Sequence, residues 1–142
     1  MNSVSEDNST NVFLISGDDE PQIAAHAHKV VRRLAGDDPD PFSLDIVRER
    51  DGVPPGETIN EVIRSIQSPP FLGNRKTVWL QNFRSFKAEG TASAKTADAR
   101  AFRDLAAHIA AGIPADIALV LSGPGIDARK ALATACNKHG TL

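Results

Sequence analysis

Short apolar runs alternate along the chain with longer segments in which apolar residues recur every three or four positions. Runs of four or five largely apolar residues are too short for helices and are typical of strands buried on both faces of a sheet. A strict apolar and polar alternation indicates a strand as well. Four strands are therefore predicted, at residues 12–15, 42–46, 77–80 and 117–121.

The first two predicted helices have recognisable ends. The acidic segment Asp18–Pro21 favours a helix start, because carboxylates suit a helix N-terminus and proline costs no hydrogen bond there, and Gly36 is a plausible end. The second helix is predicted to begin at Thr58, since Thr58 and Glu61 form a capping-box pattern, and to end before Pro69-Pro70. Residues 51–56 are predicted to be a loop.

Two further helices are predicted in the second half of the chain. One carries an apolar face of Phe102, Leu105, Ala106 and Ile109. The last is capped by Asp127, and its apolar positions are Ala128, Ala131, Leu132 and Ala135. The low-complexity segment 87–95 between the third strand and these helices is predicted to be mobile, and residues 1–11 to be a disordered tail.

Four strand and helix alternations predict an α/β fold, with a mostly parallel sheet and helices on both faces. The chain ends at Gly140-Thr141-Leu142, where such a pattern would begin another strand. We therefore expect it to be a fragment of a longer protein.

Length, composition and charge exclude or disfavour several classes of function. A chain of 142 residues is one domain, and its net charge of −2 disfavours a dedicated nucleic-acid binder. A single cysteine rules out an intrachain disulfide and a cysteine-rich zinc site. The polar N-terminus lacks the pattern of a signal peptide, and no apolar run reaches membrane-spanning length, so a cytoplasmic location is expected.

The turns after the first and third strands resemble a nucleotide-binding core whose active elements are missing. A phosphate loop needs glycines and a lysine, but the first strand leads into Asp18, Asp19 and Glu20. The third strand ends in Gln81-Asn82 rather than in acids that could hold magnesium. A phosphate-accepting receiver domain is a remote alternative, because Asn82 occupies the position that needs an aspartate, and helix-start roles are favoured for Asp18 and Asp19.

Other candidate residues favour ordinary structural roles. The four histidines, His26, His28, His108 and His139, include no pair at metal-ligand spacing, because residues two apart diverge around a helix. Cys136 lies on an apolar helix face and Trp79 in the middle of a strand, so both are expected to be packing residues. No metal site, cofactor site or catalytic residue is predicted.

The segment Ser68–Arg75 is the most unusual local feature, because Phe71 and Leu72 lie between two prolines and a Gly-Asn turn. On this feature alone, folding of both side chains back onto the sheet is favoured. The alternative is that they project into a partner's apolar pocket, where burial of both could contribute about 3–6 kcal/mol.

Three segments, taken together and in order, resemble the delta subunit of bacterial DNA polymerase III, the wrench of the clamp loader. They are Phe13–Pro21, Ile66–Val78, and Ala118–Leu121 followed by Ile126–Lys130. The resemblance spans nearly the whole chain. It implies that residues 12–142 are a degenerate AAA+-like, P-loop-type three-layer domain without functional Walker motifs, followed in the whole subunit by a lid and a collar domain.

The resemblance also implies a function. By position, Phe71 and Leu72 correspond to the hydrophobic pair with which the family enters a pocket of the beta sliding clamp. The implied role is non-catalytic: to help hold the clamp open for loading on primed DNA, in an assembly with DNA-directed DNA polymerase activity, a nucleotidyltransferase. Other loader subunits would bind through domains outside this chain, DNA contact would be indirect, and no cofactor or membrane is implied.

Two alternatives remain open. A divergent P-loop-type nucleotide hydrolase or kinase would use an atypical phosphate loop. Local DNA contact is conceivable at residues 75–103, which hold seven basic and two acidic residues, although a solvated basic face is the favoured interpretation. The basic residues are Arg75, Lys76, Arg84, Lys87, Lys95, Arg100 and Arg103.

Overall fold

A computed structural model describes residues 11–70, 75–91, 96–127 and 129–139 of the chain. Strands and helices alternate along these ranges, and all four predicted strands and four predicted long helices are present. The elements are β1 (Val12–Ile15), α2 (Glu20–Ala35), β2 (Leu44–Arg48), α3 (Pro55–Gln67), β3 (Lys76–Gln81), α4 (Ala88–Thr91), α5 (Ala97–Ala111), β4 (Ile117–Ser122) and α6 (Ala131–His139).

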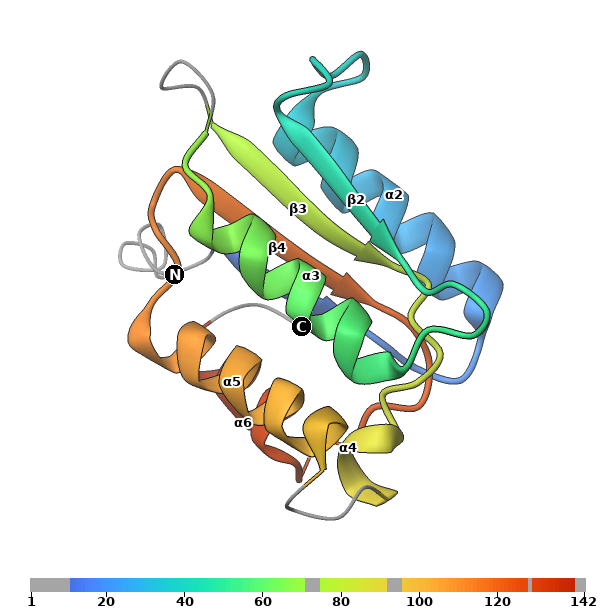
Figure 1. Cartoon of the computed structure of the whole chain (residues 1–142). Coiled ribbons are helices and arrows are strands. Elements are labelled where there is room, and N and C mark those ends of the chain that lie inside the picture. Colours follow the sequence, from blue (N-terminus) through green and yellow to red (C-terminus); the bar gives the residue numbers. More distant parts are fainter. Residues whose placement is uncertain (1–10, 71–74, 92–95, 128, 140–142) are drawn as a thin grey trace.

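The four strands form one parallel sheet in the order β1-β4-β3-β2. Helix α2 covers one face of the sheet, whereas α3, α5 and α6 cover the other (Figure 1). Because β3 and β4 are central and covered on both sides, their apolar runs are continuous rather than alternating. The predicted three-layer α/β fold with helices on both faces is confirmed.

The sheet separates two apolar layers. The larger layer packs α3, α5 and α6 against the sheet. It includes Phe83, whose ring lies edge-on to that of Phe86, with 4.8 Å between the ring centroids. The smaller layer packs α2 against the opposite face. Trp79 belongs to this smaller layer and is only 3% exposed, which confirms its predicted role as a core residue.

Helix α2 has the predicted ends. Asp19 is the residue before its first turn, and its side chain accepts a hydrogen bond from the backbone N–H of Gln22 at 3.2 Å. Gly36 ends the helix with φ of 91°, a conformation that costs glycine little. The helix-start role expected for Asp19 is therefore confirmed.

Helix α3 begins three residues earlier than predicted, at Pro55, so residues 55 and 56 are not loop. Thr58 lies inside the helix, is fully buried, and has no hydrogen-bond partner for its hydroxyl among the described residues. Glu61 does not reach back to the helix start but pairs with Arg50. Instead, the Gly56 N–H donates to Asp98 Oδ1 from α5, at 2.9 Å. The capping-box prediction is wrong because the cap comes from a distant part of the chain.

The segment predicted to be low-complexity and mobile contains helix α4. Its Glu89 accepts a hydrogen bond from the backbone N–H of Leu132 at 3.0 Å and so caps the start of α6. Asp127, the predicted cap, instead accepts from the backbone N–H of Arg129 at 2.9 Å, and α6 begins only at Ala131. Ala128 and residues 92–95 lie outside the described residues.

Two strand boundaries also differ from prediction. Phe42 precedes β2 and is 64% exposed, because the chain turns at Asp40 before pairing begins at Leu44. Asn11 does not belong to a tail: its side-chain amide donates to the carbonyl of Ile113 at 3.0 Å, and its own carbonyl accepts from the backbone N–H of Leu119. This residue therefore joins the start of β1 to β4.

Candidate functional site

The connection between α3 and β3 carries the predicted clamp-binding pair, Phe71 and Leu72, which lie outside the described residues. Both ends of this connection are described. The Lys76 ammonium donates to the carbonyl oxygens of Ser65 at 2.8 Å and Ser68 at 3.3 Å. Since the last carbonyls of a helix lack partners and carry partial negative charge, a lysine there stabilises the helix end. The two ends of the connection are thereby fastened to each other.

Neighbouring elements hold these ends from both sides. The Ser65 hydroxyl also donates to the Asp45 carboxylate of β2. The backbone N–H of Lys76 donates to the carbonyl of Asp116 before β4, at 2.9 Å, and that of Thr77 donates to the carbonyl of Ser43 at 2.8 Å. The residues at both ends of the connection are therefore held in place by hydrogen bonds, and we call them the fixed base of the connection. They lie at the amino ends of the central strands, opposite the end where parallel sheets commonly bind nucleotides.

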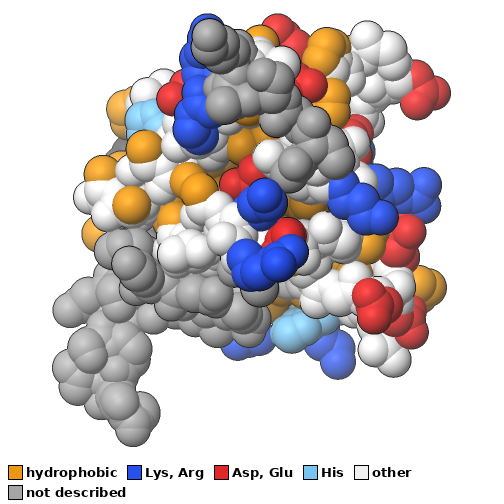
Figure 2. Space-filling model, turned by 90° about the horizontal axis from the view of Figure 1, so that it is seen from below, with side chains coloured by type: hydrophobic (Ala, Val, Ile, Leu, Met, Phe, Trp, Pro, Cys, Tyr) orange, Lys and Arg blue, Asp and Glu red, His pale blue; other side chains and the backbone are white. Residues whose placement is uncertain are grey.

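The basic residues of 75–103 do not form one face. Arg75 and Lys76 stand at the start of β3, whereas Arg84 and Lys87 follow its other end. Arg84 is paired with Glu20 at 2.9 Å. Figure 2 shows Lys and Arg side chains interspersed with Asp and Glu on the face seen from below. The described members are mostly exposed, as expected, but they stand at both ends of β3 and on α5 and so do not gather on one face.

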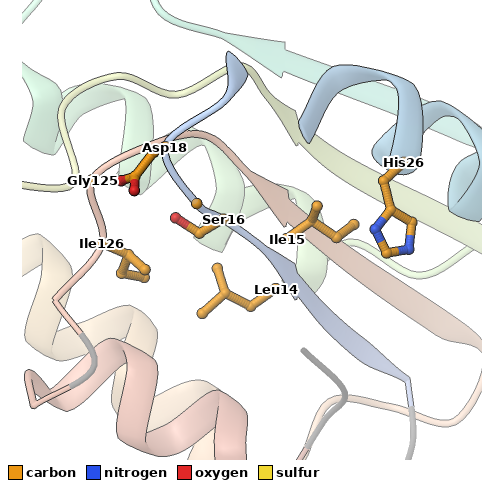
Figure 3. Close-up of a pocket in the computed structure, with 8 residues that line it drawn as sticks. Leu14, Ile15, Ser16, Asp18, His26, Gly125 and Ile126 are labelled. Atoms are coloured by element: carbon orange, nitrogen blue, oxygen red, sulfur yellow. The ribbon is translucent and has the colours of Figure 1, made fainter. Parts of the chain in front are cut away.

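The turn after β1 borders a hollow of about 470 Å³ (Figure 3). Ser16 and Asp18 lie on this turn, Gly125 and Ile126 come from the loop after β4, and His26 comes from α2. None of the residues that line the hollow is a lysine or arginine, and the adjacent helix N-terminus is capped by the Asp19 carboxylate. A second hollow on the same turn is lined by Asp18 and Glu20 together with Arg84 and Lys87, and Arg84 pairs with Glu20. The start of α2 is not free in the way a phosphate-binding loop needs, because the Asp19 carboxylate occupies it.

The carboxyl end of β3 is also occupied by contacts within the chain. Gln81 Oε1 accepts from the Arg48 guanidinium of β2 at 2.5 Å. Asn82 has φ of 51° and is exposed, so it marks the turn that leaves the strand. The neighbouring acid, Glu49, accepts from the backbone N–H of Arg84 at 2.7 Å and from the hydroxyl of Ser85. The sequence analysis missed this role of Glu49, which no local pattern signals.

The remaining candidates have structural surroundings. His28 lies edge-on to Trp79 at 5.1 Å, and the described residues contain no group of three or more histidines, cysteines and acids arranged to hold a metal. Cys136 is buried, and burial together with the charge of Glu89 raises the pKa of its thiol to about 12. A thiol that stays protonated is a poor nucleophile, which agrees with its predicted packing role.

None of the helices within the described ranges combines the length and the apolar character needed to cross a bilayer.

Comparison with known proteins identifies the family. The family model "DNA polymerase III, delta subunit" matches residues 13–142. Among solved structures, the Bacillus subtilis DNA clamp loader delta protein (YqeN) matches 96% of this chain with a TM-score of 0.60 and 19% sequence identity. The chain spans 39% of the length of that protein. No curated protein sequence matches it. The chain therefore belongs to the DNA polymerase III delta subunit family.

Proposed function

We propose that this domain binds the ring-shaped beta sliding clamp through Phe71 and Leu72 and helps to hold the ring open for loading on primed DNA. The clamp has closed and open states in equilibrium. A protein that binds the open interface more tightly shifts this equilibrium by the difference between its two affinities, and no hydrolysis is needed for that step. Family membership and the position of the pair before β3 support the proposal.

The observation that carries the proposal is the fixed base of the α3–β3 connection. Lys76 joins both ends of the connection through the Ser65 and Ser68 carbonyls, and Thr77 joins it to the segment before β2. An anchor pair held on such a base loses less conformational entropy on binding than the same pair on a freely moving segment. A hydrophobic pair presented in this way is suited to a preformed apolar pocket.

The proposed role is that of a binding module without catalysis. A carboxylate caps the helix that follows β1, and the nearby Arg84 pairs with Glu20. Energy for the loading cycle would then come from ATPase subunits, which we place, with a lid and a collar domain, outside residues 12–142. Contact with DNA would be made through the whole assembly, in the bacterial cytoplasm.

Surface plasmon resonance against a purified cognate clamp tests this function. The double variant Phe71→Ala/Leu72→Ala removes two side chains whose burial is worth about 3–6 kcal/mol, so affinity should fall by more than a hundredfold. Arg100→Ala, an exposed change on α5, is the matched control and should bind as the wild type does. Circular dichroism of each variant checks that the fold is retained. Equal binding by the double variant would move the site elsewhere.

A divergent nucleotide hydrolase or kinase is the competing function. Calorimetric titration with ATP and Mg²⁺, followed by an assay for phosphate release, separates the two. We expect neither binding heat nor turnover, because the turn after β1 carries Asp18, Asp19 and Glu20 and the Asp19 carboxylate occupies the helix start. Turnover by the purified chain would refute the non-catalytic role.

A further inference from the structure

We propose that the outer side of helix α2 contacts the sugar–phosphate backbone of DNA through Lys29, Arg32 and Arg33. The proposed function leaves contact with DNA to the whole assembly. This inference goes beyond it, because it gives the domain a direct contact of its own. Only the choice of DNA over another nucleic acid rests on the proposed function.

Six exposed residues share this side of α2. Successive residues of a helix are turned by about 100°, so residues three, four and seven positions apart lie along the same side. Five of these residues lie within about 60° of Lys29 around the helix axis. The complete set is Gln22, Ala25, His26, Lys29, Arg32 and Arg33, which we call the outer side of α2.

The charge of this helix is positive although the whole chain carries −2. Residues 21–36 contain one lysine, two arginines and two histidines but no acid. Glu20, the single acid of α2, points away from the outer side and pairs with Arg84 at 2.9 Å. The positive charge of the outer side is therefore not cancelled by acids of the same helix.

The three basic residues are available to a partner. Among the described residues, Lys29 and Arg33 have no acid within ion-pair distance. Arg32 pairs with Asp37 at 3.1 Å, but both side chains are largely exposed, at 63% and 82%, so the pair contributes little and exchanges easily. A basic last turn also stabilises a helix end, which accounts for Arg32 and Arg33 but not for Lys29, one turn earlier.

The outer side of α2 is open and rigidly supported. Of the helices that the structure describes, α2 alone covers its face of the sheet (Figure 1). Its opposite side is buried against the sheet through Ile23, Ala27, Val30 and Val31. Both ends are capped, by the Asp19 carboxylate and by the N–H of Gly36, which donates to the Arg32 carbonyl at 2.8 Å. The basic side chains therefore extend into solvent from a fixed backbone.

The residue types on this side favour nucleic acid over a protein partner. The buried centre of a protein–protein interface is enriched in aromatic residues and methionine and depleted of lysine. The outer side has neither an aromatic ring of that kind nor a methionine, and its single apolar residue is Ala25. Lysine and arginine on a polar surface are the groups that bind phosphates and fix a protein on DNA without reading its sequence.

Fluorescence anisotropy of a labelled primer–template DNA, titrated with this chain from about 50 mM salt upward, tests the inference. The triple variant Lys29→Gln/Arg32→Gln/Arg33→Gln should raise Kd about tenfold or more. Each phosphate contact releases condensed counterions, so loss of three contacts should reduce the slope of log K against log salt by about 2.7. Changing the base sequence of the duplex should leave Kd within about twofold.

A second triple variant removes the same charge elsewhere. Arg64→Gln/Arg100→Gln/Arg103→Gln changes exposed positions on α3 and α5 and should raise Kd by less than about threefold. Urea titration checks that both triple variants are folded. Lys29→Glu, a single exposed change, provides an independent test and should weaken binding more than Lys29→Gln does.

The outcomes separate this inference from the proposed function. The inference is overturned if the wild type does not bind the DNA at about 50 mM salt, or if both triple variants lose affinity equally. It is also overturned if the α2 variant keeps DNA binding but loses clamp binding, because the outer side would then be a protein contact. Equal clamp binding by Phe71→Ala/Leu72→Ala contradicts the proposed site on the clamp and leaves the DNA contact of α2 standing.

Discussion

The start of helix α3 offers the sharpest test of the packing, because sequence and structure assign its cap to different residues. The local pattern names Thr58, whereas the structure gives the role to Asp98, which lies 42 residues beyond its partner Gly56. Two substitutions separate these assignments: Thr58→Val, which replaces the hydroxyl by a methyl group of similar size, and Asp98→Ala, which removes the carboxylate.

The structure sets the expected magnitudes. Asp98 Oδ1 lies 2.9 Å from the Gly56 nitrogen in a partly buried contact. Loss of a helix cap costs about 0.5–2 kcal/mol, and loss of an acid from the first turn of α5 adds about 0.3–1 kcal/mol. Asp98→Ala should therefore lower the free energy of unfolding by about 1–3 kcal/mol. The Thr58 hydroxyl is buried without a partner, so Thr58→Val should raise that free energy by up to about 1 kcal/mol.

Urea titration followed by the fluorescence of Trp79, the single tryptophan and a core residue, measures both changes. In a thermal scan, 1 kcal/mol corresponds to about 2–4 °C in a domain of this size. Asp98→Asn, which keeps an acceptor oxygen, should lose less stability than Asp98→Ala. The reasoning is refuted if Thr58→Val destabilises the protein by more than about 1 kcal/mol while Asp98→Ala has no effect.

Four other substitutions or reactions test particular contacts. A Cβ at Gly123 would stand 1.9 Å from the Phe83 carbonyl oxygen, so Gly123→Ala should cost at least about 3 kcal/mol in a urea titration, and a neutral result would contradict this close approach. Cys136, with a thiol pKa near 12, should not react with a disulfide reagent at pH 8 until urea unfolds the chain; rapid native labelling would show that it is accessible. Burial raises the pKa of Glu89, so the folded state binds its proton more tightly than the unfolded state does, and stability falls as pH rises through that range. Glu89→Gln should therefore be more stable than the wild type at pH 7.5 but not at pH 4, and an equal gain at both would exclude ionisation as the cause. Glu49→Ala should lower stability by about 1–3 kcal/mol, because it frees the Arg84 N–H and the Ser85 hydroxyl, while leaving clamp affinity unchanged.

The fold could be predicted because its signals are local. The continuous apolar run of β4 follows from its burial on both faces, and the acidic start and the glycine end of α2 are set by adjacent residues. The two errors about helix starts have one physical cause. The caps of α3 and α6 come from Asp98 and Glu89, whose partners lie 42 and 43 residues away, and no local pattern encodes such contacts.

The candidate site was partly predictable for the same reason. Prolines and a Gly-Asn turn marked the α3–β3 connection, but nothing local showed that Lys76 would fasten both of its ends, and the residue was counted among a basic face instead. Phe42 was predicted to be a strand residue because it continues the alternation of Leu44 and Ile46. Its exposure results from the turn at Asp40, which ends the pairing first.

The polar side chains at the two ends of the sheet differ in the contacts that they make within the chain. This difference affects where a partner can bind. At the carboxyl end, Asp19 caps α2, Gln81 binds Arg48, and Glu49 holds the loop after β3. Groups engaged in this way must break contacts within the chain before they bind anything else, and each break costs stability. At the amino end, Lys76 and Asp40 also make internal contacts, but those contacts secure the backbone and leave the Phe42 side chain exposed. We therefore expect substitutions at the carboxyl end, such as Glu49→Ala, to lower stability. Under the proposed function, clamp affinity should depend instead on the connection at the amino end.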